Sequence, residues 1–189
     1  MATFDPGEPR TLPELTGTLT RLVTTGVSFL APMSDAAFFA PQGQAWSPAE
    51  HVRHLRKSSA PLVTAFKLPR FMLRLRFGSR RAPSRSFAEV RTVYLAKIKE
   101  GFQAGSYAPS AEAPPSNPTD RRNEIVNAWT GVTVELTNAI GSWSEPELDR
   151  HQLPHPAIGN LSVREMLAFT VYHTAHHLMR IEERAAGRA

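Results

Sequence analysis

The sequence predicts an all-α protein whose helices pack as a bundle. Five stretches place apolar residues at the three- and four-residue spacing of a buried helix face. No stretch alternates apolar and polar residues convincingly enough to predict a strand. The 189 residues are enough for one domain with a sizeable core. Helices without strands bury their apolar faces against one another, which is the arrangement of a bundle.

The N-terminal residues 1–10 are Pro-rich and acidic, and we expect them to form a flexible tail. Residues 11–189 are then expected to form a single helical domain. Its first helix is predicted over 11–30, where leucines and valines follow the helical period. The segment 32–45, which contains Pro41 and a glycine, is expected to be a loop.

The second helix has a clear start. Ser47 and Glu50 form the pattern of a capping box, and Pro48 occupies the first helical position, where its missing N–H is tolerated. Pro61 lies inside the same apolar pattern. A proline removes one helical hydrogen bond and its ring clashes with the preceding turn, so we expect Pro61 to kink or divide this helix.

The middle of the chain is predicted to alternate between helices and connections. The segment 67–85 fits a strand or a helix, and we favour a helical extension that ends in a loop. The remaining expected segments are a helix over 87–102, a Pro-rich linker over 104–118, a helix from about 119 to 140 and a connection over 141–159.

The last helix is predicted from Leu161 to beyond Ile181. Ser162 and Glu165 form a second capping box, and no proline or glycine follows before Gly187. One side of this helix carries a stripe that includes two histidines: Met166, Thr170, His173, His177 and Ile181.

The spacing of His173 and His177 has chemical meaning. Residues four apart stack about one turn apart on a helix, so both imidazoles can bind one divalent metal ion. The pair can equally be two hydrogen-bonded core histidines, because such motifs are common without a metal. A metal site needs a further ligand from another element. His176 is expected to point about 100° away, toward solvent or the outer contacts of the site.

The other histidines indicate where the further ligand could lie. His51 and His54 lie on the predicted second helix, nearly a turn apart, whereas the remaining five are at or near the last helix. Three imidazoles from two helices would leave a coordination position open for water or substrate, as in catalytic rather than structural zinc sites.

These residues resemble the DinB-like superfamily. The carrying motifs are Trp46-Ser47-Pro48-Ala49-Glu50 with His54-Leu55, then His155-Pro156, Gly159, Leu161 to Glu165 and Tyr172 to His177. The resemblance implies a four-helix bundle of up-down-down-up topology with a long crossover connection and an extra helix. It also implies a metal ion held by His54, His173 and His177. Three imidazoles suit zinc, nickel, copper or iron, and of these we expect zinc or nickel. Characterised members of that superfamily include transferases and isomerases that use thiols such as bacillithiol or mycothiol.

Composition limits the chemistry. The chain has no cysteine, so a metal must use His, Asp, Glu or water, and a reactive thiol must come from a cosubstrate. The net charge of +5 is uneven, because residues 51–88 hold ten Lys or Arg and no acid, while the remainder is net −5. There is no apolar run of the roughly 18 residues that a membrane span requires, and no signal peptide pattern, so a cytoplasmic location is expected.

The sequence therefore favours a divalent-metal-dependent enzyme acting on a small molecule, with a thiol-dependent transferase or isomerase as the specific form that the resemblance implies. The alternative is a non-catalytic bundle that binds a small molecule, a partner protein or nucleic acid and keeps a structural or vestigial metal site. Nucleic acid is disfavoured because no recognition motif accompanies the basic segment. Attachment of 71–77 to a membrane surface and a homodimer are further possibilities.

Overall fold

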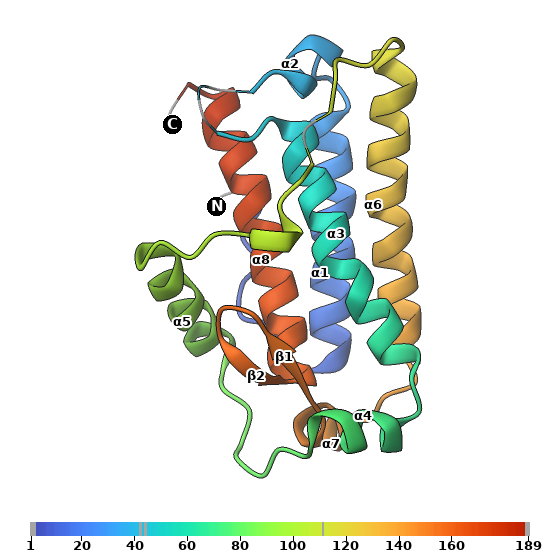
Figure 1. Cartoon of the computed structure of the whole chain (residues 1–189), viewed down its shortest axis with the longest axis vertical. Coiled ribbons are helices and arrows are strands. Elements are labelled where there is room, and N and C mark those ends of the chain that lie inside the picture. Colours follow the sequence, from blue (N-terminus) through green and yellow to red (C-terminus); the bar gives the residue numbers. More distant parts are fainter. Residues whose placement is uncertain (1–2, 42, 44, 111, 188–189) are drawn as a thin grey trace.

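Four long helices run side by side in this computed structural model, which describes residues 3–41, 43, 45–110 and 112–187. They are α1 (Leu12–Leu30), α3 (Pro48–Lys67), α6 (Pro118–Ile140) and α8 (Val163–Ala185). Helices α1 and α8 point one way, and α3 and α6 point the other, which gives the up-down-down-up order (Figure 1). Helix α3 packs mainly on α6, and α1 packs mainly on α8. The predicted bundle class is confirmed.

A long crossover joins the two helices that point the same way. Because α3 ends where α6 does, the chain must travel back along the bundle before α6 begins (Figure 1). The crossover contains α4 (Arg70–Phe77), α5 (Phe87–Lys99) and a 3-10 turn, η1 (Gly105–Tyr107). Helix α5 is the extra helix and packs against α8. It is therefore a fifth helix that packs beside the last one.

Helix α3 begins as the sequence predicts but is not divided. The capping box of Ser47 and Glu50 is present, with both reciprocal hydrogen bonds. The helix continues through Pro61 as one element to Lys67, so the predicted division is wrong. Pro61 and the residue one turn earlier, Lys57, are both exposed. The carbonyl that loses its helical partner can therefore bind water, which lowers the cost of the proline.

Two predicted connections contain structure that local patterns did not indicate. The expected loop over 32–45 includes a short helix, α2 (Asp35–Phe39). The expected connection over 141–159 contains α7 (Glu145–Arg150) and leads into an antiparallel hairpin of β1 (Gln152–His155) and β2 (Gly159–Ser162). The expectation of no strand is wrong here. Four-residue strands are too short for an alternating pattern, and Pro154 is a residue that strands rarely contain.

The N-terminal segment also differs from the expected flexible tail. Phe4 is fully buried, and its ring meets the ring of Phe29 edge-on with the centroids 5.4 Å apart. This aromatic contact attaches the segment to α1. In the described part of the chain, no helix combines the length with the hydropathy needed to span a bilayer.

The last helix occupies the centre of the fold. Every residue from Glu165 to Ala175 is buried. Helices α1, α3 and α5 and the hairpin all pack against α8, which explains burial on all of its sides. The position of α8 therefore determines where His173 and His177 lie.

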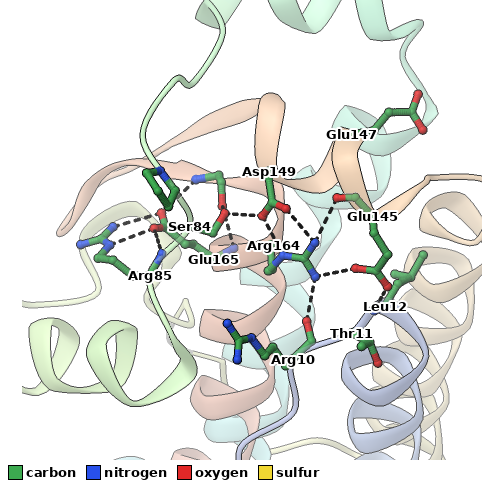
Figure 2. Close-up of polar contacts among 12 residues, drawn as sticks. Arg10, Thr11, Leu12, Ser84, Arg85, Glu145, Glu147, Asp149, Arg164 and Glu165 are labelled. Carbon is green, nitrogen blue, oxygen red and sulfur yellow. Dashed lines mark hydrogen bonds and ion pairs between the residues drawn. The ribbon is translucent and has the colours of Figure 1, made fainter.

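Charged residues anchor the first turn of α8 (Figure 2). The side chain of Glu165 is fully buried and accepts hydrogen bonds from the guanidinium groups of Arg80 and Arg85, each at 3.0 Å. It also closes the capping box with Ser162. Burial alone raises the pKa of Glu165, but the hydrogen bonds from Arg85 and Ser162 outweigh it and hold the pKa below its ordinary value. The crossover is thereby tied to the start of α8.

Arg164 makes a second set of contacts at the same end (Figure 2). Its guanidinium donates to Asp149 at 2.7 Å, to Glu145 at 2.6 Å and to the backbone carbonyl of Arg10 at 2.8 Å. Glu145 in turn accepts from the backbone N–H of Leu12. One arginine therefore joins the starts of α1 and α8 to α7.

The basic segment is largely used inside the fold. Besides Arg80 and Arg85, Lys67 pairs with Glu135, and Arg70 lies 4.0 Å from the Trp143 ring centroid and pairs with Glu147. Acidic residues elsewhere in the chain thus neutralise cations that the sequence alone presents as a basic stretch.

Gly26 generates a first prediction. A Cβ added there would lie 2.9 Å from atoms of both Leu178 and Trp129, which are buried. Gly26→Ala is expected to lower the free energy of unfolding by about 1–2 kcal/mol, because overpacking outweighs the gain in helix propensity. Gly17→Ala, on the exposed side of the same helix with open space around it, should raise that free energy by about 0.5–1 kcal/mol. Urea unfolding measures both; equal effects would contradict the close packing.

Glu165 generates a second prediction. Glu165→Gln leaves two arginines without their buried anion and should lower the free energy of unfolding by about 2–4 kcal/mol. The control Glu183→Gln removes an exposed pair with Arg180 on the same helix and should change it by less than about 0.5 kcal/mol.

Acid titration adds a second measurement for Glu165. Its pKa is lowered in the fold, so its stabilisation is present above the unfolded pKa and is lost as the pH falls through the folded pKa. Loss of wild-type stability below about pH 4.5 should therefore be steeper than in Glu165→Gln. Parallel pH profiles of the two proteins would contradict this role.

Candidate metal centre

Three imidazoles from two helices meet in the core of the bundle. His54 Nε2 lies 3.0 Å from His173 Nε2, and His177 Nε2 lies 3.1 Å from the same atom. One ring nitrogen of each residue lies within 4.8 Å of those of the other two. Among the described residues, this is the one group of three or more potential ligand side chains that converges in this way. The predicted meeting of the three side chains is confirmed.

The packing of α3 against α8 brings these residues together. The two helices run in opposite directions (Figure 1) and pack against each other. His173 and His177 lie one turn apart on α8 and face α3, where His54 lies. The ring centroid of His54 is 4.9 Å from that of His173 and 4.7 Å from that of His177. Helix spacing explains one pair, and helix packing supplies the third ring.

Burial keeps these imidazoles neutral. All three residues are less than a tenth exposed. Loss of solvent lowers the pKa values of His173 and His177 far below the ordinary value, and neighbouring imidazoles lower them further. Burial also lowers the pKa of His54, although a hydrogen bond to a backbone carbonyl opposes it. Neutral imidazoles have a free lone pair, which is the form that binds a metal.

A backbone carbonyl orients His54. Its Nδ1 lies 2.9 Å from the carbonyl oxygen of Tyr107, in η1 of the crossover. A carbonyl only accepts, so Nδ1 must carry the proton and donate it. The lone pair of His54 is therefore on Nε2, the atom that faces the other two histidines. This is the outer contact that commonly fixes a metal-binding histidine.

His51 makes the corresponding contact with His177. The two Nδ1 atoms are 2.7 Å apart, so one of them donates to the other. The guanidinium of Arg184 lies 3.4 Å from Nε2 of His51 and can only donate, so the single proton of a neutral His51 is on Nδ1 and is donated to Nδ1 of His177. A neutral His177 then carries its own proton on Nε2, which would have to be released for that atom to bind a metal. Burial, with the positive charge of Arg184 second, lowers the pKa of His51 to about 3. His51 is thus a neutral neighbour of the group and not a member of it.

The distances suit a divalent ion. Two nitrogens at about 2.0–2.1 Å from one zinc ion lie roughly 3.3 Å apart in tetrahedral geometry, and closer when the bond angle approaches 90°. The observed 3.0 and 3.1 Å fall in this range. Three lone pairs at such distances repel unless a proton or a cation lies among them. Imidazole nitrogens suit zinc, nickel, copper or iron.

A cavity of about 380 Å³ adjoins the three histidines, which form part of its wall. Its other surfaces come from α3, α5, α8, the crossover and the hairpin, with Leu62, Ile98 and Phe169 among the apolar side chains. The volume is within the range of small-molecule sites. A ligand or water in the cavity could therefore reach the point where the three nitrogens converge.

The remaining histidines have different places. His176 lines the cavity beside the convergent group, and burial lowers its pKa to about 4. His155 lines the cavity from the hairpin. His151 lies against the Trp143 ring, with centroids 5.4 Å apart, and does not line it. Sequence reasoning did not assign roles to His155, to His51 or to the carbonyl of Tyr107. A backbone acceptor leaves no signal in a sequence.

The whole pattern of helices and convergent histidines agrees with a comparison to known families. Residues 18–181 match the DinB superfamily. The chain belongs to this superfamily. The resemblance seen in the sequence motifs is therefore confirmed, and it covers the four bundle helices, the crossover and all three histidines. No curated protein matches the chain.

A solved structure shares the superfamily fold. It is that of YfiT from Bacillus subtilis, which is described as "a probable metal-dependent hydrolase with an unusual four-helix bundle topology". The TM-score is 0.62 at 15% sequence identity, over 94% of this chain and 89% of that chain. At this identity the likeness shows a common fold.

Proposed function

We propose that this DinB-superfamily protein is a divalent-metal-dependent enzyme that acts on a small molecule. His54, His173 and His177 would hold the ion, and the adjoining cavity would hold the substrate. The observation that carries the proposal is the convergence of three buried Nε2 atoms on the wall of an apolar cavity. A group of neutral nitrogen donors beside a cavity is the arrangement of a catalytic metal site with an open position.

The chain prepares these histidines for a metal. The carbonyl of Tyr107 holds the His54 proton on Nδ1, and Nδ1 of His51 is hydrogen-bonded to Nδ1 of His177. The first contact directs the Nε2 lone pair of His54 to the point where the three rings meet, and the second fixes the orientation of the His177 ring. The indole of Trp46 stacks on His177 at 6.0 Å between centroids, and Phe169 stacks on His173 at 5.0 Å. These rings restrict the imidazoles to one orientation and exclude water behind them.

An ion at this point would polarise a substrate carbonyl or lower the pKa of a bound water or thiol. The residues around it supply a surface of low polarity, which strengthens every electrostatic interaction there. None of the described residues that line the cavity is an Asp or Glu. Proton transfer by the chain would therefore rely on imidazole, and the cavity wall offers two such rings outside the convergent group, His176 and His155.

Two reaction classes fit this site. One is hydrolysis, for which YfiT, a protein of the same fold, supplies the analogy. The other is the thiol-dependent transfer or isomerisation carried out by some members of the superfamily that the sequence motifs resemble. In the second case the thiol must come from a cosubstrate, because the chain has no cysteine. The cavity favours hydrolysis or a thiol whose inserted part is uncharged, since its described lining has no Lys or Arg.

A non-catalytic binding protein with a structural metal is the alternative. A structural zinc site is normally closed by four protein ligands. The convergent group in the described chain has three members and adjoins a cavity, which supports an open site instead. Zinc or nickel as the ion, a homodimer and a cytoplasmic location remain predictions from the sequence.

Metal analysis provides the direct test. Untagged protein is expected to bind about one equivalent of zinc or nickel. His54→Ala, His173→Ala and His177→Ala should each lower the content to a small fraction, because two imidazoles do not retain the ion. His176→Ala is the matched control, since His176 lies on the same helix outside the group, and its metal content should be unchanged. Equal metal content in all four variants would refute the site.

Turnover then separates the enzyme from the binding protein. Metal-loaded protein should cleave an uncharged aryl ester, or join a thiol to an uncharged electrophile. A chelator should abolish the activity and added zinc should restore it. Stoichiometric metal without turnover of either substrate would favour the binding protein.

The contact between His51 and His177 leads to a further prediction. His51→Phe removes the hydrogen bond that fixes the orientation of the His177 ring and should weaken zinc binding about 10- to 100-fold. His51→Gln keeps a side-chain group that can hydrogen-bond Nδ1 of His177 and should lose less. Competition with a zinc chelator measures both affinities. Wild-type affinity in His51→Phe would show that the contact does not orient His177.

A further inference from the structure

His155, at the end of strand β1, has one ring nitrogen committed and the other free. Its Nδ1 lies 3.1 Å from the backbone nitrogen of Ala157 and 3.2 Å from that of Ile158. Both amides donate, so Nδ1 must be the acceptor. A neutral imidazole has a single proton, and here that proton must be on Nε2. Burial lowers the pKa of His155 to about 4, so this neutral tautomer is the form present near pH 7.

The Nε2–H of His155 is available to a ligand. His155 lines the cavity, and among the described residues none accepts a hydrogen bond from its Nε2. The described chain also leaves no fully buried side-chain nitrogen or oxygen without a partner. Nε2 is therefore accessible, on a residue that forms part of the cavity wall. The tight turn of the hairpin explains why Nδ1 accepts, but it makes no use of Nε2.

One side chain, that of Phe169, contacts both His155 and His173 of the convergent group. The ring centroid of Phe169 lies 4.3 Å from that of His155 and 5.0 Å from that of His173. A small molecule in contact with Phe169 could therefore approach the three convergent nitrogens at one end and the N–H of His155 at the other. Such a pair of fixed polar points in an apolar cavity determines which functional groups bind there.

The remaining lining determines the charge that the cavity accepts. Its described residues include no Asp, Glu, Lys or Arg; the polar ones are hydroxyl groups and imidazoles. Away from the three convergent histidines, an ionic group of a substrate would leave water without a compensating partner, which carries a large penalty. An uncharged molecule with an apolar body avoids that penalty.

We infer that the cavity selects an uncharged, mostly apolar substrate and that His155 is a specificity-determining residue that donates its Nε2–H to a carbonyl-type oxygen of that substrate. The inference rests on the proposed function, because it identifies the substrate class of the same site. It assigns the hairpin a binding role in addition to its place beside α8. One neutral hydrogen bond from this donor should make an oxygen-bearing ligand bind more tightly than its hydrocarbon counterpart.

A probe pair of similar size tests the donor. Acetophenone carries a carbonyl where ethylbenzene carries a methylene group, and neither is charged. NMR titration of the full-length protein, first treated with chelator, should give about fivefold tighter binding for acetophenone. His155→Asn should remove this difference and leave ethylbenzene binding unchanged. Asn keeps an acceptor for the two turn amides, as in an Asx-turn, but places no donor at the Nε2 position.

His155→Gln is the matched second variant. Its amide nitrogen can reach the place of Nε2, so it should recover part of the preference for acetophenone. Benzoate, the charged relative, should bind the metal-free wild-type protein at least about tenfold more weakly than acetophenone. Circular dichroism establishes that each variant is folded before titration.

Any one of three results would overturn the inference. The first is that acetophenone binds no more tightly than ethylbenzene, and the second is that His155→Asn weakens the binding of both probes equally. The third is that benzoate binds the metal-free protein as tightly as acetophenone does. Failure of the proposed function has a separate signature. It would appear as an absence of zinc uptake, which leaves the comparison of probes in chelator-treated protein intact.

Discussion

The burial of α8 on all of its sides is the constraint on which the rest of this structure depends. A helix surrounded by α1, α3, α5 and the hairpin cannot shift without opening several contacts at once. Its first turn is held by the buried carboxylate of Glu165 and by the guanidinium of Arg164, both of which bind groups from distant parts of the chain. His173 and His177 therefore occupy fixed positions in a region without bulk water.

The same burial creates the chemistry of the site. Imidazoles placed in an apolar core lose the stabilisation of their charged form, and their pKa values fall. Neutral rings must then satisfy their N–H groups within the protein, which the Tyr107 carbonyl does for His54 and Nδ1 of His177 does for His51. The Nε2 atoms of His54, His173 and His177 are left to face one another. The same hydrogen bonds pair the buried N–H groups of these rings and hold the rings in the orientation that a metal site needs.

The charge of the chain and the polarity of its cavity have to be considered separately. A segment of ten cations without an acid suggests attraction of an anionic substrate. In the fold, Arg80, Arg85 and Arg70 pair with Glu165 and Glu147, and the described cavity wall has no charged residue. The basic segment thus stabilises the crossover and the start of α8. Selection of a substrate is left to apolar contacts and a few neutral donors.

Local sequence determined much of this protein. The capping boxes at Ser47 and Ser162 and the one-turn spacing of His173 and His177 involve residues within four positions, so the sequence was enough to predict them. With the family motifs, it also identified His54 as the third histidine. Only the tertiary structure decided that Pro61 is accommodated within α3, that a hairpin precedes α8, that the Tyr107 carbonyl orients His54, that His51 contacts His177, and that His155 lines the cavity. Each of these depends on which surfaces meet after the chain folds, because distant residues interact through packing that no local pattern specifies.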